Sequence, residues 1–211
     1  MNLQGMTICF LGDSITEGAG CSSKNKVFHQ LIAKEYGLTH AYNNGLGGTR
    51  IAPQVVPGKT LTDQDLYFSL RAQVMDKNAD AVVVFGGTND YGHGDAPFGE
   101  VKDPNPKTFC GAVRTLVEYL QKTYAGKPVV FLTPLHRRNE ETPNIITGKT
   151  LAEYVSAIRE ICKEYAIPAI DLFEMNPLDP YDKEFVPDGL HPNDRGHEVL
   201  AKVIGEELAK L

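Results

Sequence analysis

Short apolar segments alternate along this sequence of 211 residues with longer segments in which apolar residues recur every three or four positions. The first pattern indicates strands that are buried on both faces, and the second indicates amphipathic helices. The predicted strands are residues 7–11, 40–43, 81–85, 129–133 and 168–172. Strands that alternate with helices pair in parallel. The sequence therefore predicts an α/β protein, a three-layer α/β/α sandwich around a parallel sheet of about five strands.

Amphipathic segments supply the helices that would cover this sheet. Their apolar stripes are residues 27–36, the weaker set Leu66, Leu70 and Val74, and residues 109–120, 151–165 and 199–211. Asn105-Pro106 predicts the start of the third helix, and Thr150 with Glu153 has the spacing of a capping box. Gly37 is typical of the residue after a helix end. Because no repeat or linker divides the chain, we expect residues 1–211 to form one domain.

The composition excludes several classes of function. The net charge is −6, and no run of Lys and Arg forms the basic face that a nucleic-acid binder needs. The longest apolar runs, such as 81–85, have about five residues, whereas a membrane helix needs roughly 20. The first residues lack the pattern of a secretory signal. We therefore expect a cytoplasmic protein with no nucleic-acid and no membrane partner.

The cysteines point to structural thiols. Cys9, Cys21, Cys110 and Cys162 are widely spaced and form no C-x-x-C pair. This spacing favours reduced side chains over disulfides or a metal site. A metal site of Asp13, Asp188 and His191 is disfavoured, because no further histidine or carboxylate has supporting spacing. We expect no metal and no cofactor.

Four long irregular stretches each follow a predicted strand. They are residues 49–62, 91–104, 134–147 and 173–192. All should emerge at the carboxyl edge of the sheet, where open α/β sheets bind ligands. The aromatic residues scattered on them are candidates to stack on a sugar ring: Tyr91, Phe98, Tyr181 and Phe185.

Two motifs contain residue types that serve nucleophilic catalysis. Gly-Asp-Ser-Ile at residues 12–15 follows the first strand and places the Ser14 hydroxyl at the ligand edge. Asp-Gly-Leu-His-Pro at residues 188–192 precedes the last helix, and an aspartate three residues before a histidine can orient its imidazole. Each motif alone is equally typical of a turn or a helix cap.

Two further motifs contain hydrogen-bond donors. Gly-Gly-Thr-Asn-Asp at residues 86–90 follows the third strand and includes the Asn89 amide, while Gly-Leu-Gly-Gly at residues 45–48 offers backbone N–H groups. Alone, the first suits an Asx turn and the second a glycine-rich turn. The three short motifs, those at residues 12–15, 86–90 and 188–192, occur together by chance in about one chain in 10⁴ or fewer.

Together the four motifs resemble those of the SGNH hydrolases, also called GDSL-family esterases and lipases, over essentially the whole chain. The resemblance implies a flavodoxin-like three-layer fold. It implies that Ser14 is the nucleophile, that His191 is its general base and that Asp188 orients the histidine. Ile15 stands where the family motif has leucine, which is a conservative change. The chain has no G-x-S-x-G elbow, so the α/β-hydrolase fold is rejected.

The resemblance also assigns the donors of an oxyanion hole. These are the backbone N–H groups of Ser14 and Gly48 and the side chain of Asn89. Gly48 is chosen by its position before Thr49, and Gly47 remains the alternative.

The expected activity is that of a serine esterase that hydrolyses small acyl esters, chiefly acetyl esters of carbohydrates. A lysophospholipase or thioesterase with the same triad is the alternative enzyme, and a ligand-binding module of the same fold is the alternative without turnover. Short acyl groups are favoured because the rim stretches contain no apolar run longer than Ile145-Ile146 that could line a channel. We expect His93, His136 and His197 to lie at the surface or at helix caps. Arg137 and Arg138 are expected to be solvated loop charges, and contact of one of them with an oxygen-rich substrate is the alternative.

Overall fold

A sheet of five parallel strands is the middle layer of the computed structural model, which describes residues 1–54, 62 and 65–211. The strand order is β2-β1-β3-β4-β5. The strands are β1 (Thr7–Gly12), β2 (His40–Gly45), β3 (Ala81–Phe85), β4 (Val129–Leu132) and β5 (Ala169–Ile170). The predicted α/β class and the five-stranded parallel sheet are confirmed. Of the predicted irregular stretch 49–62, residues 55–61 lie outside the described residues.

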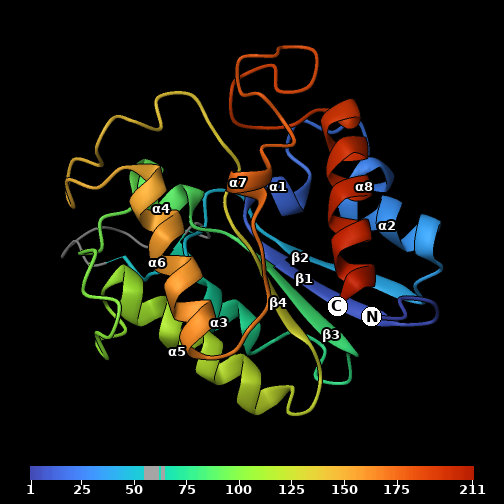
Figure 1. Cartoon of the computed structure of the whole chain (residues 1–211), viewed down its shortest axis with the longest axis horizontal. Coiled ribbons are helices and arrows are strands. Elements are labelled where there is room, and N and C mark those ends of the chain that lie inside the picture. The colour runs from blue at the N-terminus through green and yellow to red at the C-terminus, as the bar shows by residue number, and fades with distance from the viewer. Residues whose placement is uncertain (55–61, 63–64) are drawn as a thin grey trace.

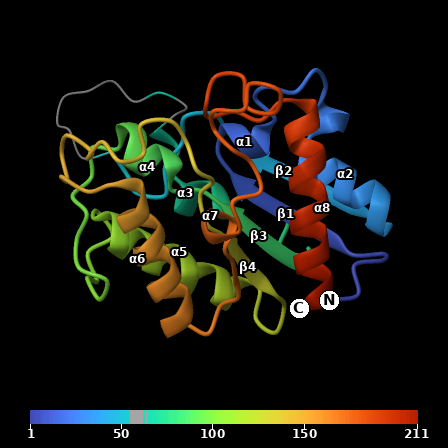
Figure 2. The ribbon, with the colours of Figure 1, turned by 45° about the horizontal axis from the view of Figure 1, so that its top comes forward.

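Helices cover both faces of this sheet (Figure 2). The helices on one face are α3 (Phe68–Ala72), α5 (Phe109–Thr123) and α6 (Leu151–Glu164), and those on the other are α2 (Phe28–Tyr36) and α8 (Asp194–Lys210). Along β1 the side chains alternate between the two layers. Cys9 and Leu11 belong to the core under α5, whereas Ile8 and Phe10 belong to the core under α8. This alternation buries every central strand on both faces, which explains their continuous apolar sequences.

Helix ends follow local sequence signals in two of the three predicted places. Gly37 ends α2 in the left-handed conformation with φ 69°, and Thr150 with Glu153 forms the predicted capping box of α6. The start predicted for α5 at Asn105-Pro106 is wrong. The Asn105 carbonyl accepts a hydrogen bond from the Thr108 N–H (3.1 Å), so these residues form a turn. Thr108 then caps α5 by accepting from the Gly111 N–H at 3.1 Å.

The weak apolar stripe around α3 was predicted to face the core, and this prediction is wrong. Leu66, Leu70 and Val74 are 42%, 40% and 85% exposed, whereas Phe68 and Arg71 are buried. The helix has only five residues, and its orientation is set by Phe68, whose ring lies within 2.6 Å of where a Cβ on Gly86 would be. The close approach of this ring to the backbone after β3 requires glycine at position 86.

Short helices at the carboxyl edge were not predicted. They are α1 (Ser14–Glu17), the 3₁₀ turn η1 (Lys24–Lys26), α4 (Thr88–His93) and α7 (Leu172–Met175). The first follows β1 and the third follows β3, so these two helices carry Ser14 and Asn89 directly from the sheet. All four cysteines are free. In the part of the chain that the structure describes, no helix combines the length and apolarity needed to cross a bilayer.

Candidate active site

Ser14, His191 and Asp188 form a continuous hydrogen-bonded chain at the carboxyl edge of the sheet. The Ser14 Oγ lies 3.0 Å from His191 Nε2, and His191 Nδ1 lies 2.7 Å from Asp188 Oδ2. Ser14 is the first residue of α1, and His191 lies in the turn before α8. Residues 177 positions apart are therefore brought into contact because β1 and α8 are neighbours in the fold.

Local hydrogen bonds hold each member of this chain in place. The Asp13 carboxylate accepts from the Ile15 N–H at 3.0 Å and caps α1. Burial raises the pKa of Asp13 to about 6. Asp188 Oδ1 accepts from the backbone N–H groups of Leu190 and His191. Burial raises the pKa of Asp188, but the hydrogen bonds from His191 outweigh this and hold it below its usual range.

The segment after β2 supplies one free backbone donor beside Ser14. The Gly47 N–H donates to Glu17 Oε2 at 2.7 Å and is thus occupied. Within the described residues no group accepts from the N–H of Gly48 or of Ser14. A Cβ on Gly47 would lie 3.7 Å from the Ser14 Cβ, so this segment passes directly over the serine. The geometry favours Gly48 over Gly47 as an anion donor.

Asn89 lies beside the same segment. Its Nδ2 donates to the Thr49 carbonyl at 3.0 Å, and the side chain is buried. An amide nitrogen carries two N–H donors. One of them holds the Gly48–Thr49 backbone against α4, and the other remains for a ligand. Asp90, the next residue, accepts from the N–H groups of Ile51 and Ala52 at 2.9 Å each.

Arg71 is a site residue that the sequence analysis missed. Its guanidinium is buried and donates to the Gly12 carbonyl (2.7 and 2.9 Å), to the Asn44 carbonyl and to the Thr49 hydroxyl (2.6 Å). Burial lowers the pKa of Arg71 to about 10, so it stays charged at neutral pH. Its cation joins the ends of β1 and β2. A lone arginine within a weak apolar stripe was the only signal in the sequence.

Several predicted surface residues are in fact packed. His197 is fully buried, and its Nδ1 accepts from the Phe28 N–H at 3.1 Å. Tyr91 is buried with its hydroxyl 2.6 Å from the Asn139 carbonyl, and Phe98 packs on the rings of Phe109 and Tyr154. Tyr91 lies in α4 and packs on the Tyr154 ring of α6, and Phe98 lies in a stretch that folds back onto α5 and α6. These contacts leave neither ring free to stack on a sugar.

The other residues singled out in the rim stretches keep different degrees of exposure. Tyr181 is 67% exposed and Phe185 is half-buried. His93 is exposed as predicted, while His136 is half-buried and pairs with Glu140 at 2.7 Å. Arg137 and Arg138 are half-buried rather than solvated, since they pack against α4 and Gly189.

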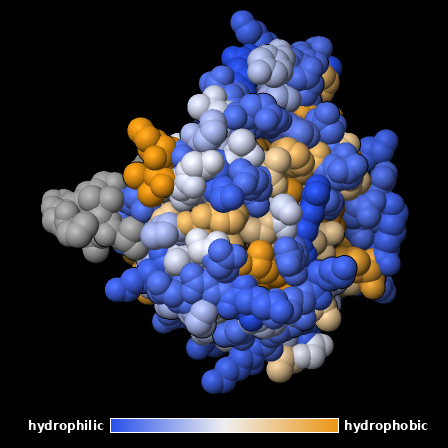
Figure 3. All heavy atoms as spheres, turned by 60° about the vertical axis from the view of Figure 1, so that its left-hand side comes forward, coloured by the Kyte–Doolittle hydropathy of each residue, from blue (hydrophilic) through white to orange (hydrophobic). Residues whose placement is uncertain are grey.

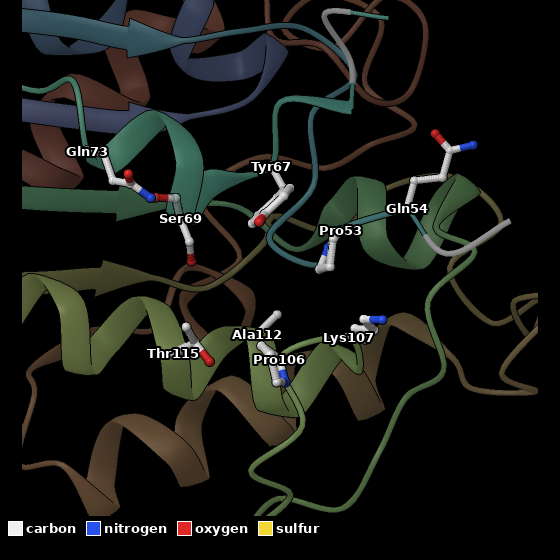
Figure 4. Close-up of a pocket in the computed structure, with 9 residues that line it drawn as sticks. All are labelled: Pro53, Gln54, Tyr67, Ser69, Gln73, Pro106, Lys107, Ala112 and Thr115. Atoms are coloured by element: carbon white, nitrogen blue, oxygen red, sulfur yellow. The ribbon is translucent and has the colours of Figure 1, made fainter. Parts of the chain in front are cut away.

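A cavity of about 640 Å³ lies away from this constellation, between α3, α5 and the segment after β2 (Figure 4). Its walls are Pro53, Gln54, Tyr67, Ser69, Gln73, Pro106, Lys107, Ala112 and Thr115. None of the hydrogen-bonded residues at the carboxyl edge lines it. Among the described residues, no group of three or more His, Cys, Asp and Glu side chains is arranged to hold a metal ion.

Comparison with known proteins assigns the family. Residues 10–199 match the profile of the GDSL-like Lipase/Acylhydrolase family. No curated protein matches the sequence. One crystal structure shares 31% identity, with 100% of this chain and 99% of that chain covered and a TM-score of 0.88.

Two further solved structures have the same fold. A protein from Lactobacillus plantarum has 27% identity, 98% coverage of both chains and a TM-score of 0.82. An acetylxylan esterase from Geobacillus stearothermophilus has 20% identity, covers 98% of this chain and 96% of its own, and has a TM-score of 0.66. The matched stretch contains all four motifs and the whole Ser14–His191–Asp188 chain, and this protein therefore belongs to the GDSL-like lipase/acylhydrolase family of ester hydrolases.

Proposed function

We propose that this protein is a serine esterase that removes short acyl groups, chiefly acetyl, from carbohydrate esters. The observation that carries the proposal is the chain from Ser14 Oγ through His191 to Asp188, with separations of 3.0 and 2.7 Å. A serine hydroxyl is a weak nucleophile until a neighbouring base accepts its proton. Here a base lies at hydrogen-bond distance, and a carboxylate holds its other nitrogen.

The reaction proceeds in two halves. In the first, Ser14 Oγ attacks the acyl carbon while its proton passes to His191 Nε2, and the alcohol then leaves with that proton. In the second, water attacks the acyl-enzyme, gives its proton to His191, and the acid departs as Ser14 regains its proton. Asp188 keeps the Nδ1–H tautomer and stabilises the imidazolium that forms in each half.

The anionic oxygen of each tetrahedral intermediate receives hydrogen bonds from the Ser14 and Gly48 N–H groups and from the Asn89 amide. The first two donors have no other acceptor among the described residues, and the third retains one N–H. One such donor lowers the barrier by about 2.7–4 kcal/mol. Ser14 and Asn89 lie in α1 and α4, and the hydrogen bond from Asn89 to the Thr49 carbonyl holds the segment that contains Gly48 beside them.

The preference for a short acyl group rests on the surface around the site. A long chain gains about 0.8 kcal/mol per buried methylene only where a continuous apolar channel exists. Figure 3 shows one side of the molecule, the left-hand side of Figure 1, where hydrophilic residues predominate around a limited apolar area. Ile145 and Ile146 are exposed at 96% and 56%, but no other exposed large aliphatic residue of the stretch 134–147 extends them into a channel.

We place this reaction in the cytoplasm.

A panel of acetyl, butyryl, octanoyl and thioester substrates on the wild type and on Ser14→Ala tests the proposal. We expect kcat/KM to fall steeply beyond about four acyl carbons and Ser14→Ala to be inactive. Faster cleavage of octanoyl esters or of thioesters would identify a lysophospholipase or thioesterase. If no ester is turned over and an organophosphonate also fails to label Ser14 in the folded wild type, the serine is not activated and the protein is a binding module.

A further inference from the structure

A second cavity, of about 400 Å³, lies beside α4, the helix that carries Asn89. It lies between α4 and the segment that joins β4 to α6, which passes over α4 in both ribbon views (Figures 1 and 2). Tyr91–Asp95 form one wall, and residues 137–139 and 142–146 form the other. Two arginines, Arg137 and Arg138, are therefore adjacent in its lining.

These two arginines differ from the others in the described part of the chain. Four arginines there form ion pairs with carboxylates, and Arg71 is saturated by carbonyl and hydroxyl oxygens. Neither the Arg137 nor the Arg138 guanidinium forms an ion pair with a described carboxylate, although the Arg137 backbone N–H donates to Glu140 Oε2 at 2.8 Å. The Nε atom of each is buried without an acceptor, as are those of Arg50 and Arg159. Burial lowers the pKa of Arg137, and the negative charges of Asp13, Asp188 and Glu140 act in the opposite direction.

The guanidinium groups of these two arginines contact neutral groups and aromatic rings. Arg137 donates to the Thr88 carbonyl at 3.1 Å and lies over the Tyr91 ring, and Arg138 lies over the Tyr181 ring. The acidic residue of the lining, Asp95, is bound by Arg50 at 3.4 Å. The cavity thus presents two cations whose nearest contacts are neutral groups and aromatic rings.

Both arginines contact the backbone that carries the proposed catalytic groups. The Arg138 N–H donates to the Gly189 carbonyl at 2.9 Å, and its side chain covers Gly189, the neighbour of Asp188. Arg137 binds Thr88, the neighbour of Asn89. These contacts connect the lining of the cavity with both ends of the proposed catalytic site.

We propose that Arg137 and Arg138 bind an anionic group of the substrate, so that the enzyme acts on O-acetylated sugars that carry a carboxylate or a phosphate. This inference rests on the proposed esterase function. An acetyl group carries no ionisable group, so the anion lies on the alcohol part of the ester. A guanidinium offers paired N–H donors that match both carboxylate and phosphate oxygens.

The test compares three acetylated substrates: a neutral methyl glucoside, the matching methyl glucuronoside and a sugar phosphate. In the wild type, kcat/KM for at least one charged substrate should exceed that for the neutral one about 10- to 100-fold, the range of charge-assisted hydrogen bonds. In Arg138→Gln this ratio should collapse towards one. The charged substrate whose kcat/KM falls more in Arg138→Gln shows whether the site recognises a carboxylate or a phosphate.

Arg114→Gln is the matched control, because Arg114 pairs with Glu164 at 2.8 Å and does not line the cavity. It should leave the ratio unchanged, and an equal fall in this variant would overturn the proposal in favour of a general charge effect. Equal wild-type rates on all three substrates would refute the inference while leaving the esterase function intact. Calorimetric titration of methyl glucuronoside and sugar phosphate into wild type and Arg138→Gln tests binding without turnover, and binding of neither to the wild type would contradict it.

Discussion

Ser14 stands in an environment built by its immediate neighbours. Gly12 ends β1 where a Cβ would lie 2.0 Å from the Thr16 hydroxyl and 2.9 Å from the Phe85 carbonyl, so only glycine fits there. Asp13 caps the helix that Ser14 begins. These contacts fix the backbone around Ser14, and its hydroxyl lies 3.0 Å from His191 Nε2.

Substitutions of Ser14 and His191 should not be additive. If the two residues act as one nucleophile–base unit, Ser14→Ala, His191→Ala and the double variant lose similar amounts of activity. Steady-state kcat of the three variants, with folding checked by circular dichroism, measures this. Retention of more than about a tenth of wild-type kcat by Ser14→Ala would contradict covalent catalysis.

Asn89 should act on the intermediate rather than on substrate binding. Asn89→Ala is expected to lower kcat about 10²–10³-fold with little change in KM, because the amide meets the charge only after attack. Asn78→Ala, at an exposed turn, is the control and should be silent. An effect confined to KM would make Asn89 a substrate-positioning residue.

At the scale of elements, the site is assembled where α1, α3 and the segment after β2 meet. Glu17 at the end of α1 accepts from the Gly47 N–H at 2.7 Å, and Arg71 of α3 binds carbonyls at the ends of β1 and β2. These contacts set the direction of the Gly48 N–H. Elements that do no chemistry thus determine the geometry of the oxyanion donors.

Glu17 is a positioning residue whose role is testable by conservative rescue. Glu17→Ala frees the Gly47 N–H and should lower kcat about 10- to 100-fold with KM nearly unchanged, since small misplacements of donors are costly. Glu17→Gln keeps an acceptor oxygen and should restore most of the activity. Equal losses in both variants would show that the carboxylate charge, rather than the hydrogen bond, matters.

The contact between α2 and α8 contains a pH-sensitive pair. His29 and His197 are both fully buried, and burial lowers the pKa of each to about 4. The unfolded chain binds these protons near pH 6.5, so the stability that neutral histidines contribute is present above that pH and is lost as the pH falls towards 4. Each histidine contributes on the order of 3 kcal/mol to this loss.

His197→Asn isolates the effect, because asparagine keeps an acceptor for the Phe28 N–H but does not titrate. Denaturant unfolding at several pH values should give a variant whose stability falls less between pH 6.5 and 4 than that of the wild type. The difference between the two proteins is the useful quantity, since burial raises the pKa of Asp13 and Asp90 to about 6 and opposes the trend. Parallel curves would show that the pKa of His197 is the same in the folded and the unfolded state.

At the scale of the whole molecule, two hydrophobic cores share one sheet. One core lies under α3, α5 and α6 and the other under α2 and α8, and β1, β3 and β4 contribute side chains to both. Loss of either helical layer would expose one face of every central strand. The two cores are therefore expected to unfold together.

We predict one cooperative unfolding transition for the whole chain. Far-ultraviolet circular dichroism would follow the helices and near-ultraviolet dichroism the 9 tyrosines, since the chain has no tryptophan. Coincident midpoints would support residues 1–211 as one domain. Separated midpoints would mean that the α2–α8 layer and the α5–α6 layer are independent units.

The strands and most helices could be predicted from the sequence because their signals are local. A run such as Ala81–Phe85 is apolar throughout because both faces of the strand are covered, and Gly37 and Thr150 act within one turn of a helix. The motifs around Ser14 and Asp188 are local in the same sense. Their proposed catalytic roles stay predictions that the kinetic experiments above address.

Tertiary structure alone decided which polar groups are buried and which of them form hydrogen bonds. The sequence favours Gly48 over Gly47 only by its position before Thr49, whereas the contact that occupies the Gly47 N–H depends on Glu17, 30 residues away. The burial of His197 depends on Phe28, 169 residues away, and the packing of Arg138 depends on Gly189, which lies in a different segment of the chain. Burial and hydrogen-bond saturation are properties of contacts between distant segments, so no local pattern of residues encodes them.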